Sequence, residues 1–550
     1  MLDLLIEGGL VHDGRGSPPR IADVGIRDGR VVAIEPGLRA PAVTRRDARG
    51  CWVTPGFVDI HTHYDLEVEV APGLAESVRH GVTTVVMGNC SLSLTVGDPA
   101  VLADVFLRVE NLPGPLVRKW LAGALPLGTP AEYLEHLRGL PLGPSVAPLL
   151  GHSALRAHVM GLRRSLAGPA GPADIAAMRA IAGQALEAGC AGISIDMLPW
   201  HMMSGRYRGR TIPSQHADLA EYAMLADLCR ERDAVFQVTP DPQRAGSLLD
   251  ILRLALPATR RPLRVTVLSA LDPVGRPGLW RLFPAVLLVA NRLLGGNVRF
   301  QTLTEPFTVY SDGPLTPLFE EFPTGVRLND AQDRAEREGL WRSPDFRDRF
   351  RDEWTRGWRK TFHRDLRRMT IVASPDQSLA GRTVHEVARA RGLAPVETFM
   401  DLLAEHDADL RWVATGANAR PGPRRRLLRH PHILPGFTDA GAHARNIAFF
   451  DGALSLLREA VATGFMSPER AVARVTGEPA RWFRLEAGLL EVGARADLCI
   501  LRPEGLRAPV PPPVPLDDPV LDGAFRLVKR GSQEVVDAVY VGGQPAVEHG

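Results

Sequence analysis

The chain has 550 residues, which is too long for one ordinary domain and long enough for a barrel of roughly 250 residues with an accessory domain. Hydrophobic residues make up 45% of it and charged residues 23%, as in average globular proteins, so we expect a large buried core. The net charge of +2, without a dense Lys/Arg stripe, predicts no nucleic-acid partner.

The two ends of the chain have the character of short β-strands separated by turns. Gly8-Gly9 and Asp28-Gly29 are typical hairpin signals near the N-terminus, and Gly542-Gly543 is a turn near the C-terminus. The expected strands are Leu4–Ile6, Leu10–His12, Ala22–Ile26, Val31–Ile34, Asp497–Leu501 and Ala538–Val541. Because neither end has enough strands to enclose a core, we expect residues 1–54 and 485–550 to form one composite β-sandwich.

The long middle segment alternates apolar strand-like runs with helical stretches, which predicts parallel βαβ units. The expected strands include Thr83–Met87, Ile193–Ile195, Val235–Val238, Val265–Leu268 and Val298–Thr302, and the expected helices include Pro172–Gly189 and His216–Arg232. We expect a helical insertion around 305–370, in which the charged, Trp-containing residues 330–370 predict helices on the surface, a candidate lid. The expected fold class is therefore α/β, with residues 55–484 forming a TIM-type (β/α)8 barrel beside the terminal β-sandwich.

The most informative motif is Pro-Gly-Phe-Val-Asp-Ile-His-Thr-His, in which an apolar strand ends in two histidines at 61 and 63. Side chains alternate along a strand, so His61 and His63 project to the same side. At the carboxyl end of a first barrel strand, both would face the mouth where barrel active sites lie. Two imidazoles in this arrangement can chelate one Zn²⁺, Mn²⁺ or Fe²⁺ ion.

Two later apolar runs also end in residues that carry chemistry. Gly-Val-Thr-Thr-Val-Val-Met-Gly-Asn-Cys places the thiol of Cys90 at the end of the next strand, as a metal ligand or as a small buried apolar residue. Gly-Phe-Thr-Asp-Ala-Gly-Ala-His places Asp439 at the end of a late strand, suited to accept a proton from an activated water. His443 follows and either reaches the same mouth or lies on a solvated turn.

Further polar residues are weaker candidates for the site. His201 follows a barrel strand and is either an additional ligand or a solvent-exposed loop residue. His152 either contacts a substrate carbonyl or orders its loop, and Arg156 or Arg206 offers a guanidinium fork for a substrate carboxylate. Gln237 lies on a mid-barrel strand.

Together the HTH strand, the run ending in Cys90, GHSALRAHVMG at 151–161 and the late FTDAGAHA resemble the N-acyl-D-amino-acid deacylase (D-aminoacylase) branch of the amidohydrolase superfamily. The resemblance covers most of residues 1–500. It implies that His61, His63 and Cys90 are metal ligands and that Asp439 is the catalytic acid/base. It also implies hydrolysis of an amide C–N bond, as in an N-acyl amino acid, by a zinc-activated water.

This sequence departs from the family at two mid-barrel strand ends. The family has a metal-binding histidine after each, whereas the matching positions here are Thr239 and Ser269. Neutral hydroxyls are poor ligands for Zn²⁺, and no lysine between Lys119 and Lys360 is available to bridge metals. Three interpretations follow: a metal site completed by His201 or His443, a distinct branch with a rearranged site, which we favour, or a metal-free site.

The competing functions follow from these interpretations. A metal-poor enzyme of the same fold would perform acid/base chemistry, such as cyclisation, dehydration or C–C bond formation, on a specialised metabolite. A non-catalytic binding role on the inherited fold is disfavoured because the two histidines and Asp439 are retained. The expected partner in either enzymatic case is a small-molecule substrate, and a homo-oligomer is left open.

The cellular setting is indicated by cysteine usage and by the apolar runs. Five scattered cysteines without a CxxC pair indicate a reducing compartment rather than a disulfide framework. The N-terminus lacks a signal-peptide pattern, so we expect a cytoplasmic protein. The most apolar stretch, Leu279 to Leu294, contains arginine, proline and asparagine and is too short to span a bilayer, so no membrane partner is expected.

Overall fold

The structure is a computed structural model that describes the chain except residues 113, 124–127, 257–260, 357–360, 523 and 550. Its centre is a ring of parallel strands that follow the chain in order. The ring strands are β6 (Phe57–Asp59), β7 (His61–Thr62), β8 (Val82–Met87), β9 (Ser145–Gly151), β10 (Gly192–Asp196), β11 (Val235–Thr239), β12 (Arg264–Val267), β13 (Asn297–Thr302), β17 (Ile433–Pro435) and β18 (Phe437–Ala440).

Pairing between the first and last strands closes the ring. The order β17-β13-β12-β11-β10-β9-β8-β6 forms one sheet, and β18 pairs in parallel with β7. Helices follow the strands and cover the outside, among them α3 (Pro99–Val109), α6 (His152–Met160), α8 (Pro172–Ala188), α9 (Leu219–Arg232), α10 (Ala245–Ala255), α11 (Leu282–Leu287) and α18 (Gly452–Thr463). The expected TIM-type barrel is confirmed.

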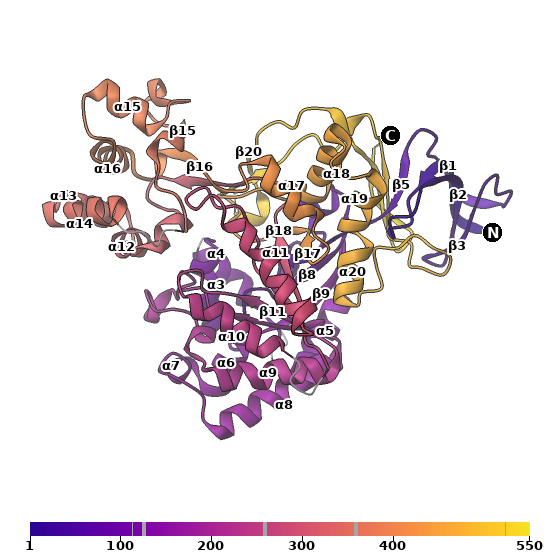
Figure 1. The fold of residues 1–550 in the computed structure, drawn as a ribbon, viewed down its shortest axis with the longest axis horizontal. Coiled ribbons are helices and arrows are strands. Elements are labelled where there is room, and N and C mark those ends of the chain that lie inside the picture. Colours follow the sequence, from indigo (N-terminus) through magenta and orange to yellow (C-terminus); the bar gives the residue numbers. More distant parts are fainter. Residues whose placement is uncertain (113, 124–127, 257–260, 357–360, 523, 550) are drawn as a thin grey trace.

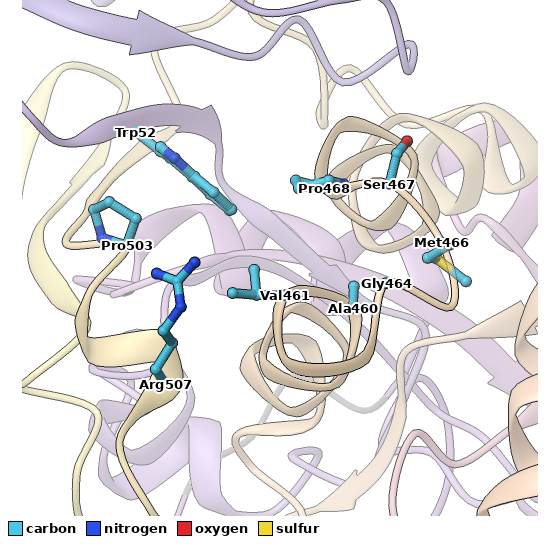
Figure 2. Close-up of a pocket in the computed structure, with 9 residues that line it drawn as sticks. All are labelled: Trp52, Ala460, Val461, Gly464, Met466, Ser467, Pro468, Pro503 and Arg507. Carbon is cyan, nitrogen blue, oxygen red and sulfur yellow. The ribbon is translucent and has the colours of Figure 1, made fainter.

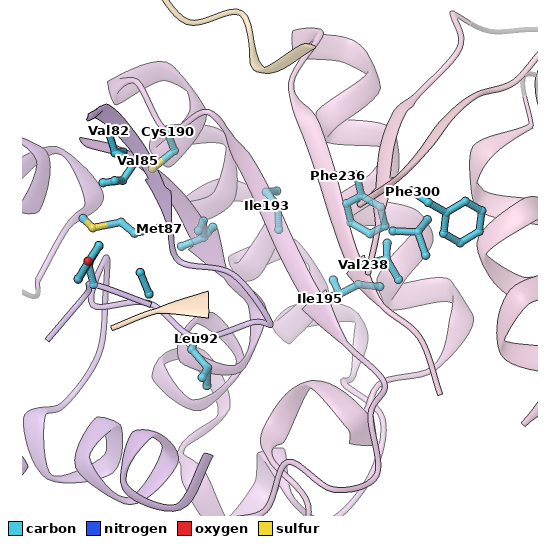
Figure 3. Packing of buried hydrophobic residues seen from close by; sticks show 14 of the residues in the cluster. Val82, Val85, Met87, Leu92, Cys190, Ile193, Ile195, Phe236, Val238 and Phe300 are labelled. Atoms are coloured by element: carbon cyan, nitrogen blue, oxygen red, sulfur yellow. The ribbon is translucent and has the colours of Figure 1, made fainter. Parts of the chain in front are cut away.

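The barrel core is explained by alternation along each strand. Figure 3 shows the apolar residues of β10 and β11 that face the surrounding helices: Ile193, Ile195, Phe236 and Val238. The residues between them, Ser194, Gln237 and Thr239, are also fully or almost fully buried and therefore line the inside of the barrel. The outward residues form the hydrophobic core, whereas the inward residues are polar: Gln237 donates to the Thr239 hydroxyl, and the Ser194 hydroxyl donates to the backbone carbonyl of Gly88.

The two termini meet in a single mixed sheet beside the barrel, as the sequence predicts. In Figure 1 both ends of the chain lie on this side of the molecule. The C-terminal strand β19 (Leu498–Leu501) pairs with β5 (Trp52–Pro55), which leads directly into the barrel. The remaining strands are β1 (Leu2–Val11), β2 (Arg20–Arg27), β3 (Arg30–Glu35), β4 (Ala42–Asp47), β22 (Val536–Val541) and β23 (Gln544–Glu548).

One turn expected in this sheet is wrong. Gly8-Gly9 does not end a hairpin but lies within the continuous strand β1, where the register with β2 shifts as at a β-bulge. A Cβ on Gly9 would come within 2.4 Å of Cγ2 of Val53, so the residue permits close contact between strands. The turns at Asp28-Gly29 and Gly542-Gly543 do join strands, and all four residues have positive φ.

The segment between β13 and β17 contains helices in the range 305–370, where a helical insertion is expected, and strands as well. An antiparallel sheet of β14 (Phe307–Asp312), β16 (Arg411–Ala417) and β15 (Met369–Ala373) extends beyond that range, and residues 357–360 lie outside the described ones. The helices here are α12 (Pro323–Asp330), α13 (Arg334–Arg342), α14 (Pro344–Thr355), α15 (Val384–Arg391) and α16 (Pro395–His406). They share a second, aromatic-rich core and stand to one side of the barrel (Figure 1).

A short hairpin near the C-terminus crosses back to the barrel mouth. Its strands are β20 (Val514–Asp517) and β21 (Phe525–Val528). The backbone N–H of Leu527 donates to the carbonyl of Ala444, which follows the last barrel strand. The buried Arg526 guanidinium forms an ion pair with Glu67, which follows the first strand. The hairpin therefore braces two loops at the rim. No helix in the described ranges is long and apolar enough to cross a bilayer.

Candidate metal centre at the barrel mouth

Three predicted ligands converge where β7 and β8 end. Donor atoms of His61, His63 and Cys90 all lie within 4.8 Å of one another, and all three residues are buried. Nε2 of His61 is 3.4 Å from Sγ of Cys90. Two sequence-distant strand ends therefore present two imidazoles and a thiol to one point.

Asp439 reaches the same cluster from β18, the last ring strand, which pairs with β7 where the ring closes. Its Oδ1 is 3.5 Å from Nε2 of His61 and 3.4 Å from Nε2 of His63. The Asp439 side chain is 19% exposed, whereas those of His61 and His63 are 0% and 5% exposed. The carboxylate is therefore the member of the cluster that is most accessible from solvent.

The local backbone explains why these side chains meet. Cys90 and Asp439 have positive φ angles of 51° and 56°, a costly conformation for non-glycine residues that tends to occur at functional sites. The carboxylate of Asp59 accepts the backbone N–H of His61 and the hydroxyl of Thr438, so it joins the first and last strands. The pairing of β7 with β18 then brings Asp439 to the two histidines.

Each imidazole is held from behind by an oxygen that sequence reasoning missed. Nδ1 of His61 is 2.7 Å from Oε1 of Gln301, on β13. Nδ1 of His63 is 3.0 Å from Oε1 of the buried Glu110, which follows α3. Gln301 could have been found from the sequence, because it occupies an inward-facing position of β13, as Gln237 does on β11. Glu110 carries no such signal, because it lies just beyond a helix.

The donor set and its spacing fit a divalent ion such as zinc. Zn–N and Zn–S bonds of about 2.0 and 2.3 Å in a tetrahedron place a nitrogen and a sulfur donor roughly 3.5 Å apart, which is close to the 3.4 Å between Nε2 of His61 and Sγ of Cys90. Oε1 of the buried Glu110 lies 3.0 Å from Nδ1 of His63 as an ion pair, although its geometry is not that of a hydrogen bond. The cluster thus combines suitable ligands with a buried carboxylate behind one of them.

Burial and neighbouring charge set the protonation states of the free cluster. Burial lowers the pKa of His61 to about 3 and raises that of the Cys90 thiol to about 11. Burial opposes protonation of His63, but Glu110 and Asp439 raise its pKa well above the usual value. Burial raises the pKa of Asp439, yet its contacts with the two histidines leave it below normal, so this carboxylate is ionised.

The two missing mid-barrel histidines are replaced by groups with different roles. The Thr239 hydroxyl donates to Sγ of Cys90 at 3.3 Å. Gln237 accepts the backbone N–H of Cys90 and donates to Thr239. Ser269 lies beyond the end of β12 and is partly exposed. Thr239 and Gln237 therefore hold the thiol in place.

His201 and His443 lie near the rim of the same mouth. Nδ1 of His201 is 2.7 Å from Oδ2 of Asp196, the last residue of β10. Burial opposes protonation, but Asp196 raises the pKa of His201 above its usual value. The backbone N–H of His443 donates to the carbonyl of Glu110. Burial lowers the pKa of the His443 ring, although the charge of Asp439 acts in the opposite direction.

His152 and Arg156 point away from this cluster. Nε2 of His152 and Nε of Arg156 both contact Oε1 of Glu221, at 2.7 and 2.6 Å, and all three side chains are fully buried. Arg156 also donates to backbone carbonyls, including that of Pro213. Both residues are thus held in an internal ion-pair network, in agreement with the alternative that His152 orders its loop.

A cavity in the described part of the chain lies elsewhere. It measures about 510 Å³ and lies between the end of α18, the strand residue Trp52 and the C-terminal segment. Figure 2 shows Trp52 and Arg507 pointing into it. Its lining contains none of the predicted site residues, so it is separate from the metal cluster.

The pattern of the amidohydrolase family matches residues 45–547. An uncharacterized protein of Mycobacterium tuberculosis is 40% identical, covering 98% of this chain and 91% of its own length. The N-acyl-D-glutamate deacylase of Alcaligenes xylosoxydans xylosoxydans is 31% identical, covering 91% of this chain and 87% of its own length.

Two solved structures share the fold. The N-acyl-D-glutamate deacylase of Bordetella bronchiseptica, crystallised with zinc and a phosphonate inhibitor, has a TM-score of 0.65 at 23% identity, covering 99% of this chain and 96% of its own. A D-aminoacylase has a TM-score of 0.64 at 23% identity, covering 100% and 97%. At this identity the likeness concerns the architecture.

Proposed function

The chain belongs to the amidohydrolase family, and we propose that it is a hydrolase that cleaves the amide C–N bond of an N-acyl amino acid or a related small amide. The supporting observation is the convergence of His61, His63, Cys90 and Asp439 at the barrel mouth. The relative named N-acyl-D-glutamate deacylase covers most of this chain and supports the same substrate class.

The residues of this chain divide the work of such a reaction. His61, His63 and Cys90 would hold the ion, with Asp439 beside it. Zinc or a similar divalent ion, when bound, supplies a Lewis acid that polarises a carbonyl and acidifies water. Asp439, ionised and the most exposed of the four, is placed to take the proton of the attacking water and deliver it to the leaving amine.

Positive charge at the rim suits the carboxylate of an N-acyl amino acid. Oδ2 of Asp196 lies 2.7 Å from Nδ1 of His201 and raises the pKa of the ring, which favours the protonated form that a substrate carboxylate would pair with. His443, whose pKa is lowered, would be neutral nearby. These roles belong to the proposal, and they predict selectivity for acyl compounds with a free carboxylate over the corresponding esters.

The test combines elemental analysis with a substrate panel. The purified chain should contain about one zinc or similar ion and should hydrolyse at least one member of a panel of N-acyl-D- and N-acyl-L-amino acids. Removal of the metal by a chelator should abolish hydrolysis, and its return should restore it. A metal-loaded protein that hydrolyses no amide in the panel would contradict the proposed reaction.

A second candidate is supported by the hydrogen bonds on Cys90. Thr239 stands where the resemblance implies a metal-binding histidine, yet its hydroxyl donates to Cys90, so a metal-poor enzyme using acid/base chemistry on a specialised metabolite is the alternative. Elemental analysis separates the two. A metal content far below one ion per chain, together with an activity that a chelator does not change, would favour the second candidate.

A further inference from the structure

One helix on the outside of the barrel presents apolar side chains to solvent. Helix α11 continues as a π-helical segment, Leu288–Leu293, and both follow β12 in the chain. Leu288 is 55% exposed and Leu293 is 69% exposed. The inner side of the same segment, including Leu287 and Ala290, is fully buried in the barrel core. The segment is therefore apolar on its outer as well as its inner side.

The exposed residues form a continuous stripe. Leu282, Val289 and Leu293 follow one another at helical spacing, and Leu288 lies beside them. Leu279 and Leu294 extend the stripe at its two ends with 37% and 46% exposure. We call Leu279, Leu282, Leu288, Val289, Leu293 and Leu294 the apolar stripe. Monomeric proteins rarely expose a contiguous apolar patch without a binding role.

Charge around the apolar stripe is exclusively positive along the chain. No aspartate or glutamate occurs between Pro273 and Thr304. Arg281 and Arg292 lie exposed near its two ends, and the guanidinium groups of Arg281 and Arg426 lie 4.9 and 5.5 Å from the Trp280 ring centre. In the part of the chain that the structure describes, none of these three arginines forms an ion pair. They are free to meet anions.

We propose that the apolar stripe and its arginines bind the surface of an anionic lipid bilayer. A helix with leucine and valine on one side and arginines at its edge is typical of segments that lie in the headgroup region. Anionic headgroups attract arginines that no protein carboxylate neutralises. The segment would lie on the bilayer surface rather than across it, so the proposal replaces the expectation from sequence that the chain has no membrane partner.

A second copy of the chain fits this face less well. Two copies related by a twofold axis would place the same patch against itself. Arg281 and Arg292 of both copies would then approach one another, and this stretch provides no carboxylate to pair with them. Charge complementarity therefore favours lipid phosphate as the partner.

The test measures binding of the full-length protein to vesicles by flotation. Vesicles of phosphatidylcholine mixed with phosphatidylglycerol should bind the protein at least tenfold more tightly than vesicles of phosphatidylcholine alone, and added salt should weaken the binding. The double variant Leu288→Glu/Leu293→Glu should lose at least tenfold in affinity. Both residues are exposed, so the variant should retain its thermal unfolding temperature.

Matched variants separate the apolar and charged contributions. Leu393→Glu changes a leucine that is 47% exposed in the segment between β13 and β17, and it should bind vesicles like the unchanged protein. Arg281→Gln/Arg292→Gln should weaken binding to anionic vesicles and flatten its dependence on salt.

Four results with vesicles would overturn the proposal. They are no binding to anionic vesicles, equal binding to both vesicle types, unchanged binding of Leu288→Glu/Leu293→Glu, and loss of binding in Leu393→Glu to the same extent. Light scattering provides an independent check. A dimer that Leu288→Glu/Leu293→Glu converts to monomer would assign the stripe to a second copy of the chain and would also overturn it.

Discussion

Gln301 accepts the Nδ1–H of His61 at 2.7 Å, and this contact leaves Nε2 of the same ring as its basic nitrogen. Nε2 is the atom that faces Cys90 and Asp439. Glu110 holds Nδ1 of His63 in the corresponding way, with a carboxylate in place of an amide. Both histidines therefore direct Nε2 toward Asp439, but they differ in charge, because only His63 has a carboxylate at its Nδ1.

Removing the Gln301 amide should weaken metal binding. Gln301→Leu leaves Nδ1 of His61 without an acceptor, so we expect the affinity for zinc to fall by about 10- to 100-fold. Competition with a chromogenic chelator measures it. Gln301→Glu keeps an oxygen acceptor and serves as the matched control, so equal losses in both variants would argue against an orienting role.

Neutralising Glu110 should affect the site through His63. Glu110→Gln keeps the size of the side chain but removes the charge 3.0 Å from Nδ1, and we expect about a tenfold loss of zinc affinity. Titration calorimetry at constant pH gives the value. A variant that binds zinc normally but unfolds at lower temperature would show that Glu110 has only a structural role.

Replacing Asp439 should separate catalysis from metal binding. Asp439→Asn keeps the shape but cannot accept a proton, so we expect kcat to fall by about 10² to 10⁴, with the metal content nearly unchanged. Asp345→Asn, which changes an exposed aspartate on α14, is the control and should retain full activity. Retained activity of Asp439→Asn would contradict its assignment as acid/base.

Breaking the internal network should reduce stability and leave the metal centre intact. Glu221→Gln removes the carboxylate that pairs with the fully buried Arg156 at 2.6 Å and with His152 at 2.7 Å. An uncompensated buried cation costs about 3–5 kcal/mol. Denaturant unfolding should show this loss, while zinc stoichiometry stays the same. A change in zinc content with normal stability would point to a direct role in the site.

The same network predicts a dependence of stability on pH. Burial raises the pKa of Glu221, but His152 and Arg156 lower it further, so the net pKa is below its usual value. A depressed folded-state pKa contributes stability that is present above the unfolded-state pKa of about 4.3 and is lost as pH falls through the folded value. The stability difference between the unchanged protein and Glu221→Gln should therefore shrink on acidification below this range, as measured by urea unfolding at several pH values.

Local sequence pattern predicted the barrel strands and the side chains at the centre of the site, but not Gln301 and Glu110 behind the histidines. Alternating apolar residues in Phe236–Val238 and the strand leading to His61 predict strands because the period of two depends on neighbouring residues alone. The same period places His61 and His63 on one side and Cys90 at the next strand end. Local pattern also gave one wrong prediction. Gly8-Gly9 has the composition of a turn, but it lies within β1 as a bulge, in close contact with Val53 of a distant strand.

The sequence by itself therefore determined the barrel strands, the pairing of the termini and the residues that can bind a metal. Tertiary structure alone decided which oxygen stands behind each histidine, because Gln301 and Glu110 approach from distant parts of the chain. It also decided that Arg156 is an internal ion-pair partner. The physical reason is that periodicity records which way a side chain points, whereas its partner depends on closure of the ring.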